Sequence, residues 1–297
     1  MQTVVDDLER RAEELLGVID ELLRHSGLHV AIPRGSMIIS TNGDMGWDKL
    51  DVEARQLQAR ALRDYERFHS LCSILLLSVS TDGREALKDA DDEVREAIDQ
   101  HGLTWSKTTT EVYDKVANRL LSVVKTLRGL YDASRGAALF VPDTNALLAN
   151  VDLETWRFPD ISPFVLMLTP TVLAELDSLK INHRNEVVRE KSEGLITRIK
   201  GYRARGNLLD GVPLKRGVSE LRSIAVEPDM NETLPWLDPA NDDDRFIASV
   251  IEVMRQHPHS PVALVTRDIN MQNKAAFASL PFFEPPTAAK SSKQSKG

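Results

Sequence analysis

Hydrophobic residues in the first 130 positions recur every three or four places, the spacing of one face of an α-helix. Three such stripes alternate spacings of three and four, which is the pattern of helices that pack along one seam. The third stripe follows Thr108–Glu111, a capping-box signature for a helix start. We therefore predict a helical bundle or coiled-coil-like hairpin over residues 1–135. The stripes consist of Val5, Leu8, Ala12, Leu15, Ile19 and Leu22; Ala61, Tyr65, Phe68, Cys72, Leu75 and Val79; and Val112, Val116, Leu120, Val123, Leu127 and Leu130.

Two segments of this first half are less regular. Residues 82–100 are very acidic and predict either a shorter helix or a linker. Residues 26–47 contain Gly27, Pro33, Gly35, Gly43 and Gly46, and these residue types predict a loop between the first two helices. The whole first half is thus expected to be helix and loop.

The hydrophobic pattern changes close to residues 134–136. Beyond that boundary, short apolar runs alternate with helical patterns, which favours an α/β domain with a mostly parallel sheet over residues 136–286. The final residues, 287–297, are rich in Ala, Ser and Lys and predict a disordered tail. Strands are expected over 137–141, 164–168, 224–226 and 262–265, and helices over 171–180, 186–204, 243–255 and 269–278.

Composition narrows the class of protein. The chain has 297 residues, of which 42% are hydrophobic and 28% charged, the balance of an ordinary globular protein. Its one cysteine, Cys72, excludes an internal disulfide framework and a cysteine-based zinc site. No apolar run reaches the roughly 18 residues of a membrane span, and the acidic, amphipathic start does not resemble a signal peptide. We therefore expect no membrane partner and a cytoplasmic location.

The net charge of −8 argues against a protein that binds nucleic acid over its whole surface. The charges are unevenly distributed, however. Residues 184–222 contain ten bases and five acids, whereas acidic residues gather elsewhere in the second half. A basic flank beside an acidic cluster is typical of a metal-dependent enzyme that acts on a polyanion, although a solvated helix face gives the same pattern.

Acidic side chains follow the predicted strands of the second half. Asp143 comes directly after the first strand, Asp268 follows the last, and Glu175 lies one turn into the helix after the second strand. Asp242–Asp244 open another helix, where acids also suit the helix dipole. Because ligands of parallel sheets bind beyond the carboxyl ends of the strands, we expect these carboxylates to converge.

Clustered carboxylates repel one another, and a hard divalent cation relieves this repulsion. Mg²⁺ prefers oxygen ligands, keeps several waters, and needs only one or two direct carboxylates. The seven histidines are scattered and show no zinc spacing. The sequence therefore predicts a site for a hard divalent cation such as Mg²⁺.

Four segments resemble the motifs of the PIN-domain nucleases. Val141–Leu148 is similar to their first strand and DTN signature, and Thr169–Lys180 to their second motif, P-x-V-x-x-E-L-D. Asn241–Ala248 resembles the D-D-R-I-L motif, and Leu264–Asn270 the final motif, (V/L)-(S/T)-x-D-x-(N/D). The motifs occur in the family's order across residues 138–286. The resemblance is strongest to the PIN domains associated with PhoH-like ATPases.

The resemblance implies a three-layer α/β/α fold and Mg²⁺- or Mn²⁺-dependent endoribonuclease activity. The family's acidic centre maps onto Asp143, Glu175 and Asp268, and its third acid onto either Asp243 or Asp244. The ligands of the cation would be Asp143, Asp268 and one of these two residues. The polar supports of the motifs are matched by Asn145, Thr266 and Asn270.

In the mechanism that the resemblance implies, Glu175 helps to position an activated water, which attacks the RNA phosphate and leaves a 5′-phosphate and a 3′-hydroxyl. Basic residues beside the acidic centre would follow the backbone of the single strand. The candidates for this role are Arg184, Arg189, Lys191, Arg198, Lys200 and Arg203.

Three other functions compete with this interpretation. A DNA nuclease of the related flap class usually has more acids and a helical clamp. A catalytically silent PIN-like module that binds RNA or protein would not need all the acids that are present. A ribonuclease toxin paired with an antitoxin usually lacks a long helical half. The helices of residues 1–135 could form a homo-oligomer, bind a partner protein, or inhibit the nuclease.

Overall fold

The computed structural model describes residues 1–31, 45–77, 81–131 and 136–287. Its chain forms two compact units. One comprises Val5–Leu130, and the other comprises Met1–Val4 with the chain from Tyr131 onward. The expected tail at 288–297, the boundary residues 134 and 135, the stripe position 79 and the middle of the expected loop, 32–44, lie outside the described residues.

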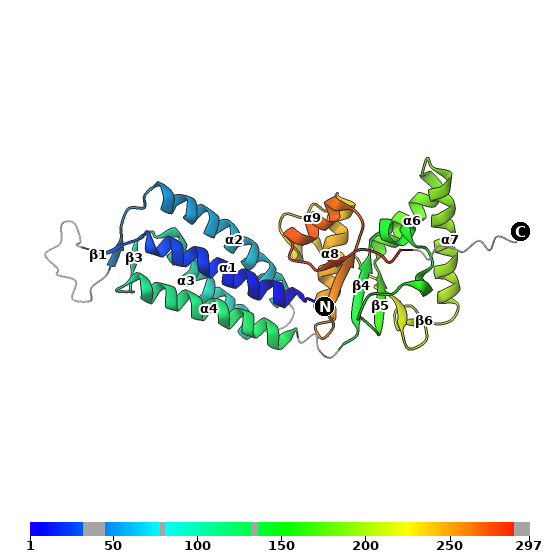
Figure 1. Cartoon of the computed structure of the whole chain (residues 1–297), viewed down its shortest axis with the longest axis horizontal. Coiled ribbons are helices and arrows are strands. Elements are labelled where there is room, and N and C mark those ends of the chain that lie inside the picture. The colour runs from blue at the N-terminus through cyan, green and yellow to red at the C-terminus, as the bar shows by residue number, and fades with distance from the viewer. Residues whose placement is uncertain (32–44, 78–80, 132–135, 288–297) are drawn as a thin grey trace, which may run out of the picture. The chain divides into compact units, whose positions relative to one another are not determined.

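In its described residues, the first unit contains four long helices, α1 (Val4–Arg24), α2 (Val52–Leu76), α3 (Thr81–Asp99) and α4 (Thr109–Leu130). Helices α2, α3 and α4 pack against one another (Figure 1). Arg128 of α4 forms ion pairs with Asp6 and Glu9 of α1. Within the described residues, the apolar stripes of α1, α2 and α4 are buried apart from Leu130 at the end of α4. The helical first half is thereby confirmed.

The structure tests the predictions for residues 82–100 and for the capping signature at 108–111. Residues 82–100 lie mostly in helix α3, which buries Leu87, Ala90 and Val94 despite its acidic composition. The Thr108 hydroxyl accepts a hydrogen bond from the Glu111 amide at 3.2 Å, as a helix N-cap does. The capping signature therefore marks the start of α4.

A small antiparallel sheet in the helical unit was not predicted. It has the order β1 (Leu28–Val30), β2 (Met45–Trp47) and β3 (Leu103–Thr104). The expectation of only helix and loop in the first half was wrong at these residues. Strands of two or three residues are too short to show an alternating pattern, and they are stabilised by pairing between distant segments.

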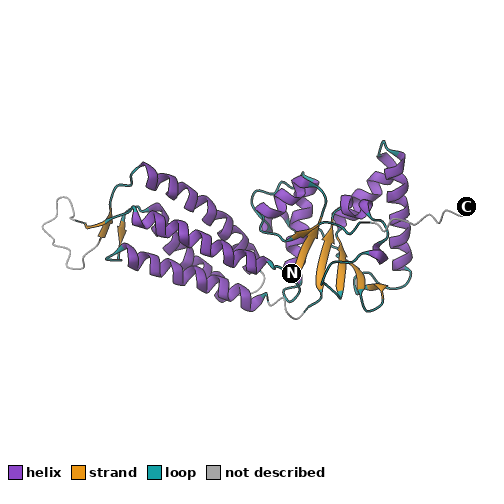
Figure 2. Ribbon diagram, viewed as in Figure 1, coloured by secondary structure: helices purple, strands orange, loops and turns teal. Residues whose placement is uncertain are grey.

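The second unit contains a six-stranded sheet with the order β6-β7-β5-β4-β8-β9. All neighbouring strands are parallel except the β6–β7 hairpin. This confirms the predicted α/β class with a mostly parallel sheet (Figure 2). The strands are β4 (Ala138–Pro142), β5 (Phe164–Leu168), β6 (Val212–Lys215), β7 (Ser219–Ser223), β8 (Val262–Val265) and β9 (Phe282–Phe283).

Five α-helices accompany this sheet in the described residues. Thr169 caps α6, with Pro at the first position, and Asn241 caps α8, so both helix starts follow ordinary capping chemistry. The helices are α5 (Thr144–Ala149), α6 (Pro170–Asn182), α7 (Glu186–Arg203), α8 (Asp242–Gln256) and α9 (Ile269–Phe277). Short 3-10 turns span Leu153–Thr155 and Met230–Glu232.

Strand prediction was wrong at residues 224–226. Strand β7 ends at Ser223, and Val226 is 72% exposed. The true strand reads Ser-Glu-Leu-Arg-Ser, in which only Leu221 is hydrophobic, so it gives no apolar run. Its charged residues Glu220 and Arg222 form an ion pair at 2.8 Å instead of packing in the core.

An aromatic cluster forms the centre of the α/β unit. Phe140 is fully buried on β4 and stacks on Phe158 with ring centroids 3.7 Å apart. Phe164 and Phe283 meet Phe140 edge-on, at 5.7 and 5.3 Å. These contacts join β4, β5 and β9 and fix the register of the strands whose carboxyl ends bear the acidic residues.

Among the described residues, no helix combines the length and the apolar character needed to cross a bilayer. Cytoplasmic location and assembly through the N-terminal helices stay predictions.

Candidate active site

Asp143 and Asp268 lie at the carboxyl ends of two adjacent parallel strands. Pro142 at the end of β4 pairs with Val265 at the end of β8. The Asp143 amide donates to the Val265 carbonyl at 3.0 Å, which joins the two strand ends directly. Neighbouring parallel strands that end together create a crevice for ligands.

Asp143 caps helix α5. Its Oδ1 accepts a hydrogen bond from the Ala146 amide at 2.6 Å, and its Oδ2 accepts one from the Thr266 hydroxyl. The side chain is buried, and burial raises the pKa of the carboxyl to about 6, a rise to which the charges of Glu175 and Asp268 add. The two hydrogen bonds act in the opposite direction but are weaker. Ionisation of Asp143 therefore costs more free energy than ionisation of an aspartate in water, and a bound cation would lower that cost.

Thr266 connects the two aspartates. It is completely buried, donates its hydroxyl to Asp143, and accepts the Asp268 amide at 2.9 Å. Asp268 in turn caps α9 through the Asn270 and Met271 amides, at 2.7 and 3.4 Å. The structure thus gives Thr266 the supporting position that its motif implies.

Glu175 approaches the same place from helix α6. Its Oε2 accepts a hydrogen bond from the Thr144 hydroxyl at 2.7 Å. Partial burial raises the pKa of Glu175, and the charges of Asp242 and Asp243 raise it further. Thr144 was not among the predicted site residues, although its position directly after Asp143 in the first motif could have indicated it.

The acids at the start of α8 have different environments. Asp242 and Asp243 are exposed and line the acidic cleft. Asp244 is buried and lies outside it: Oδ2 accepts the Asp238 amide at 3.1 Å, and Oδ1 pairs with Lys274 Nζ at 2.7 Å. Lys274 Nζ also lies 3.4 Å from Asp243 Oδ2, so it contacts both aspartates, but successive helical side chains point about 100° apart and Asp244 is turned away from the cleft. Of the two candidates for the third acid, the structure brings only Asp243 to the cleft.

The acidic cleft is a cavity of about 50 Å³ at the carboxyl edge of the sheet. Five carboxylates converge on it from four segments of the chain, together with Asn145. The side chain of Asn270 does not line this cleft. The Asn270 main-chain amide donates a hydrogen bond to Asp268 and so helps to hold that carboxylate in place. The residues that line it are Asp143, Thr144, Asn145, Thr171, Val172, Glu175, Asp242, Asp243, Phe246, Asp268 and Met271.

The polar side chains that line the cleft suit a hard cation by their chemistry, because they offer carboxylate, amide and hydroxyl oxygens. Among the described residues, no three His, Cys, Asp or Glu side chains are arranged to hold a metal directly. Mg²⁺ commonly binds through one or two carboxylates and several waters, so a hydrated ion does not require such a triple. The cleft therefore fits a cation held largely through water.

Three of the six predicted RNA-binding residues have structural partners. Arg189 donates to the main-chain carbonyl of His183 at 2.7 Å, and Lys191 to that of Leu148 at 3.2 Å. Arg198 pairs with Asp152 at 3.3 Å. Within the described chain, the other three form no ion pair; these are Arg184, Lys200 and Arg203.

Substitution of Asp243 and of Asp244 tests whether the first acts in the cleft and the second stabilises the fold. We expect Asp243→Asn to lower any metal-dependent activity by tenfold or more without loss of stability, because this side chain is exposed at the cleft. We expect Asp244→Asn to lower the unfolding free energy by about 1–3 kcal/mol, because it weakens a buried partner of Lys274. Activity assays at 20 °C and urea titrations measure the two effects. Equal activity loss in both variants would contradict this division.

Residues 140–284 match a family model described as PIN domain. The match extends from β4 through β9 and contains every carboxylate of the acidic cleft. It confirms the resemblance that the four motifs indicate. The chain matches no curated protein.

Proposed function

We propose that this protein is a Mg²⁺- or Mn²⁺-dependent endoribonuclease. The premise is that residues 140–284 form a PIN domain and so belong to a nuclease superfamily. The observation that carries the proposal is the convergence of Asp143, Glu175, Asp243 and Asp268 on one cleft. The raised pKa of Asp143 supports it, because a bound cation would lower the cost of ionising this buried carboxyl.

The residues of the cleft have separate roles in this proposal. Asp143, Asp243 and Asp268 would hold the cation, and Thr266 fixes Asp143. A divalent cation in such a site lowers the pKa of a bound water and neutralises charge on the phosphate. Glu175, whose Oε2 is occupied by Thr144, uses Oε1 to orient the attacking water. A bond forms between the water oxygen and phosphorus while this water releases a proton to solvent, the bond from phosphorus to O3′ breaks, and O3′ takes a proton from solvent.

The direct test is incubation of the purified full chain with labelled single-stranded RNA and Mn²⁺ or Mg²⁺. We expect cleavage that EDTA abolishes and that DNA of the same sequence does not undergo. Preferential DNA cleavage would favour the flap-type alternative. Cation binding with no cleavage of either polymer would favour a silent binding module and contradict the proposal.

Cation affinity should depend on pH through Asp143. Because its pKa is raised to about 6, the carboxyl is protonated below that pH, and protons then compete with the cation. We expect the Mn²⁺ affinity to fall by up to about tenfold per pH unit below pH 6 and to level off above pH 7. Calorimetric titrations between pH 5 and 8 measure this dependence. Asp143→Asn serves as the control, and its Mn²⁺ affinity should no longer change near pH 6. A wild-type Mn²⁺ affinity that does not depend on pH would contradict the role of Asp143 as a cation ligand.

A further inference from the structure

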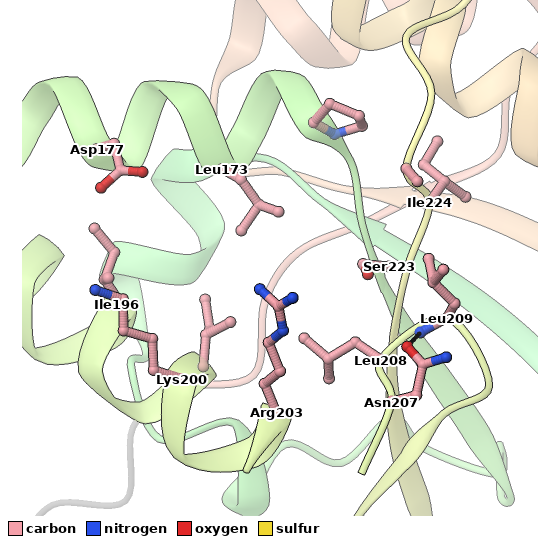
Figure 3. A pocket seen from close by; sticks show the side chains of 13 residues that line it. Leu173, Asp177, Ile196, Lys200, Arg203, Asn207, Leu208, Leu209, Ser223 and Ile224 are labelled. Carbon is pink, nitrogen blue, oxygen red and sulfur yellow. Dashed lines mark hydrogen bonds between the residues drawn. The ribbon is translucent and has the colours of Figure 1, made fainter.

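A second, larger cavity lies apart from the acidic cleft. It has a volume of about 550 Å³, within the usual range of small-ligand sites. Helices α6 and α7 and the end of β7 enclose it (Figure 3). Leu173, Ile196 and Leu208 give it an apolar wall, and Lys200 and Arg203 add two cations. Such a lining accommodates a ligand with both an apolar part and an anionic part.

This cavity and the acidic cleft share helix α6. Pro170 and Leu173 line the cavity, whereas Thr171, Val172 and Glu175 line the cleft. Residues two apart on a helix point to nearly opposite faces, so α6 forms a wall between the two sites. One helix diameter, roughly 10 Å, thus separates them.

Both sites also open at the same edge of the sheet. The acidic cleft is formed where β4 and β8 end, and the cavity includes Ser223 at the end of β7 and Pro170 just after β5. The distance from β4 to β7 is two strand spacings, roughly 10 Å. A flexible polymer held at the acidic cleft can reach this cavity along the edge of the sheet.

The two cations of the cavity are available to a ligand. Nearby Arg198 and Arg205 pair with Asp152 and Glu154, but neither Lys200 nor Arg203 forms an ion pair with any described residue. Both side chains are exposed at the last turn of α7. The acid that lines this cavity, Asp177, is itself neutralised by Lys180 at 2.6 Å. The net charge at the opening is therefore positive.

We infer that this cavity holds one nucleotide of the single-stranded RNA substrate, with its phosphate on Lys200 and Arg203 and its base against the apolar wall. The inference rests on the proposed ribonuclease function and adds a binding subsite to it. Phosphate attracts paired cations, and a base buries apolar faces without requiring a particular sequence. The subsite would place the RNA strand around the N-terminal end of α6.

Two variants test the two halves of this subsite. Lys200→Gln with Arg203→Gln removes the positive charges and leaves the cavity open. Ala225→Trp narrows the cavity and keeps both positive charges. Ala225 is an exposed residue that lines the cavity, so the added ring does not disturb the core. The matched control is Arg216→Gln, an exposed cation without an ion pair in the described residues, in the turn between β6 and β7 at the opposite end of the sheet.

Binding is measured by fluorescence anisotropy of a labelled oligouridylate 12-mer in EDTA, over a series of KCl concentrations. We expect the double variant to raise Kd about tenfold and to reduce the slope of log K against log salt by about 0.7, the contribution of the one phosphate held at this subsite on a single strand. We expect Ala225→Trp to raise Kd about fivefold with an unchanged slope. Arg216→Gln should stay within twofold of wild type.

The inference is overturned if the double variant binds within twofold of Arg216→Gln, if Ala225→Trp binds as wild type, or if the wild type does not bind the 12-mer. Because these measurements need no cleavage, they are independent of the nuclease assay. RNA that binds at this subsite but is never cut would overturn the proposed function alone. RNA that is cut equally by all three variants, with unchanged Kd, would overturn the subsite alone.

Discussion

Asp143→Asn is expected to lower the rate of RNA cleavage by on the order of 10²–10³-fold, the usual effect of removing one preorganised charged group from an active site. Asp143 is the most buried acid of the cleft, and it is held by both Thr266 and the Ala146 amide. Asn keeps the size of the side chain but removes the negative charge. Single-turnover cleavage at saturating Mn²⁺ measures the effect.

The same substitution should stabilise the metal-free protein at neutral pH. In the fold, burial raises the pKa of Asp143 from 3.8 to about 6, which corresponds to roughly 3 kcal/mol against the ionised form. Between these two pH values the folded state binds more protons than the unfolded state, so stability falls as the pH rises through that window and stays low above it. The increase in the unfolding free energy caused by Asp143→Asn should thus be largest at pH 7 and fall nearly to zero at about pH 4. Thermal melts in EDTA at both pH values measure it.

Asp160→Asn is the matched control for Asp143→Asn. Asp160 is exposed before β5, at the opposite end of the strand from the cleft, and its positive φ of 58° suits Asn. Its variant should cut RNA within twofold of wild type. An Asp143→Asn protein that retains full activity, or that loses activity because it unfolds at pH 7, would contradict the role given to this residue.

Phe140→Ala is expected to lower the unfolding free energy of the α/β unit by about 3–5 kcal/mol. The ring is fully buried, stacks on Phe158, and meets Phe164 and Phe283 edge-on. Its removal leaves a cavity between strands that hold the acidic cleft in place. We expect the melting temperature of this unit to fall by roughly 6–20 °C.

Phe282→Ala is the control for Phe140→Ala, because Phe282 lies beside Phe283 on β9 but is 40% exposed. Its variant should lose less than about 1.5 kcal/mol, since the ring is only partly removed from water. Urea titration followed by circular dichroism compares the two proteins. Similar losses in both would mean that the aromatic cluster does not dominate the stability of this unit.

Periodicity along the chain was sufficient to predict the elements with strong local signals. The stripe that contains Leu8, Leu15 and Leu22 predicts α1, because residues seven apart lie on the same face of a helix and all three are buried. The runs at Phe164–Leu168 and Val262–Val265 predict β5 and β8 with correct bounds because buried parallel strands are apolar on both faces. Acids directly after such strands predicted that carboxylates would meet, since parallel strands end at one edge.

Other elements gave no usable signal. Strand β7 has one hydrophobic residue, and β9 has two residues in all. Each is specified by hydrogen bonds to strands far away in the sequence, β7 to β5 and β9 to β8. Local sequence does not encode such pairing, because the partners are brought together only when the core forms.

The sequence by itself determined that this chain has a helical half and an α/β half, and that acids of the second half follow its strands. Only the tertiary structure decided which acids share the cleft. Asp243 lines it and Asp244 does not: Lys274 pairs with both, but only Asp244 is buried and accepts the Asp238 amide. It also decided which basic residues are unpaired, since a side chain's partners depend on segments that the sequence leaves distant and packing brings together.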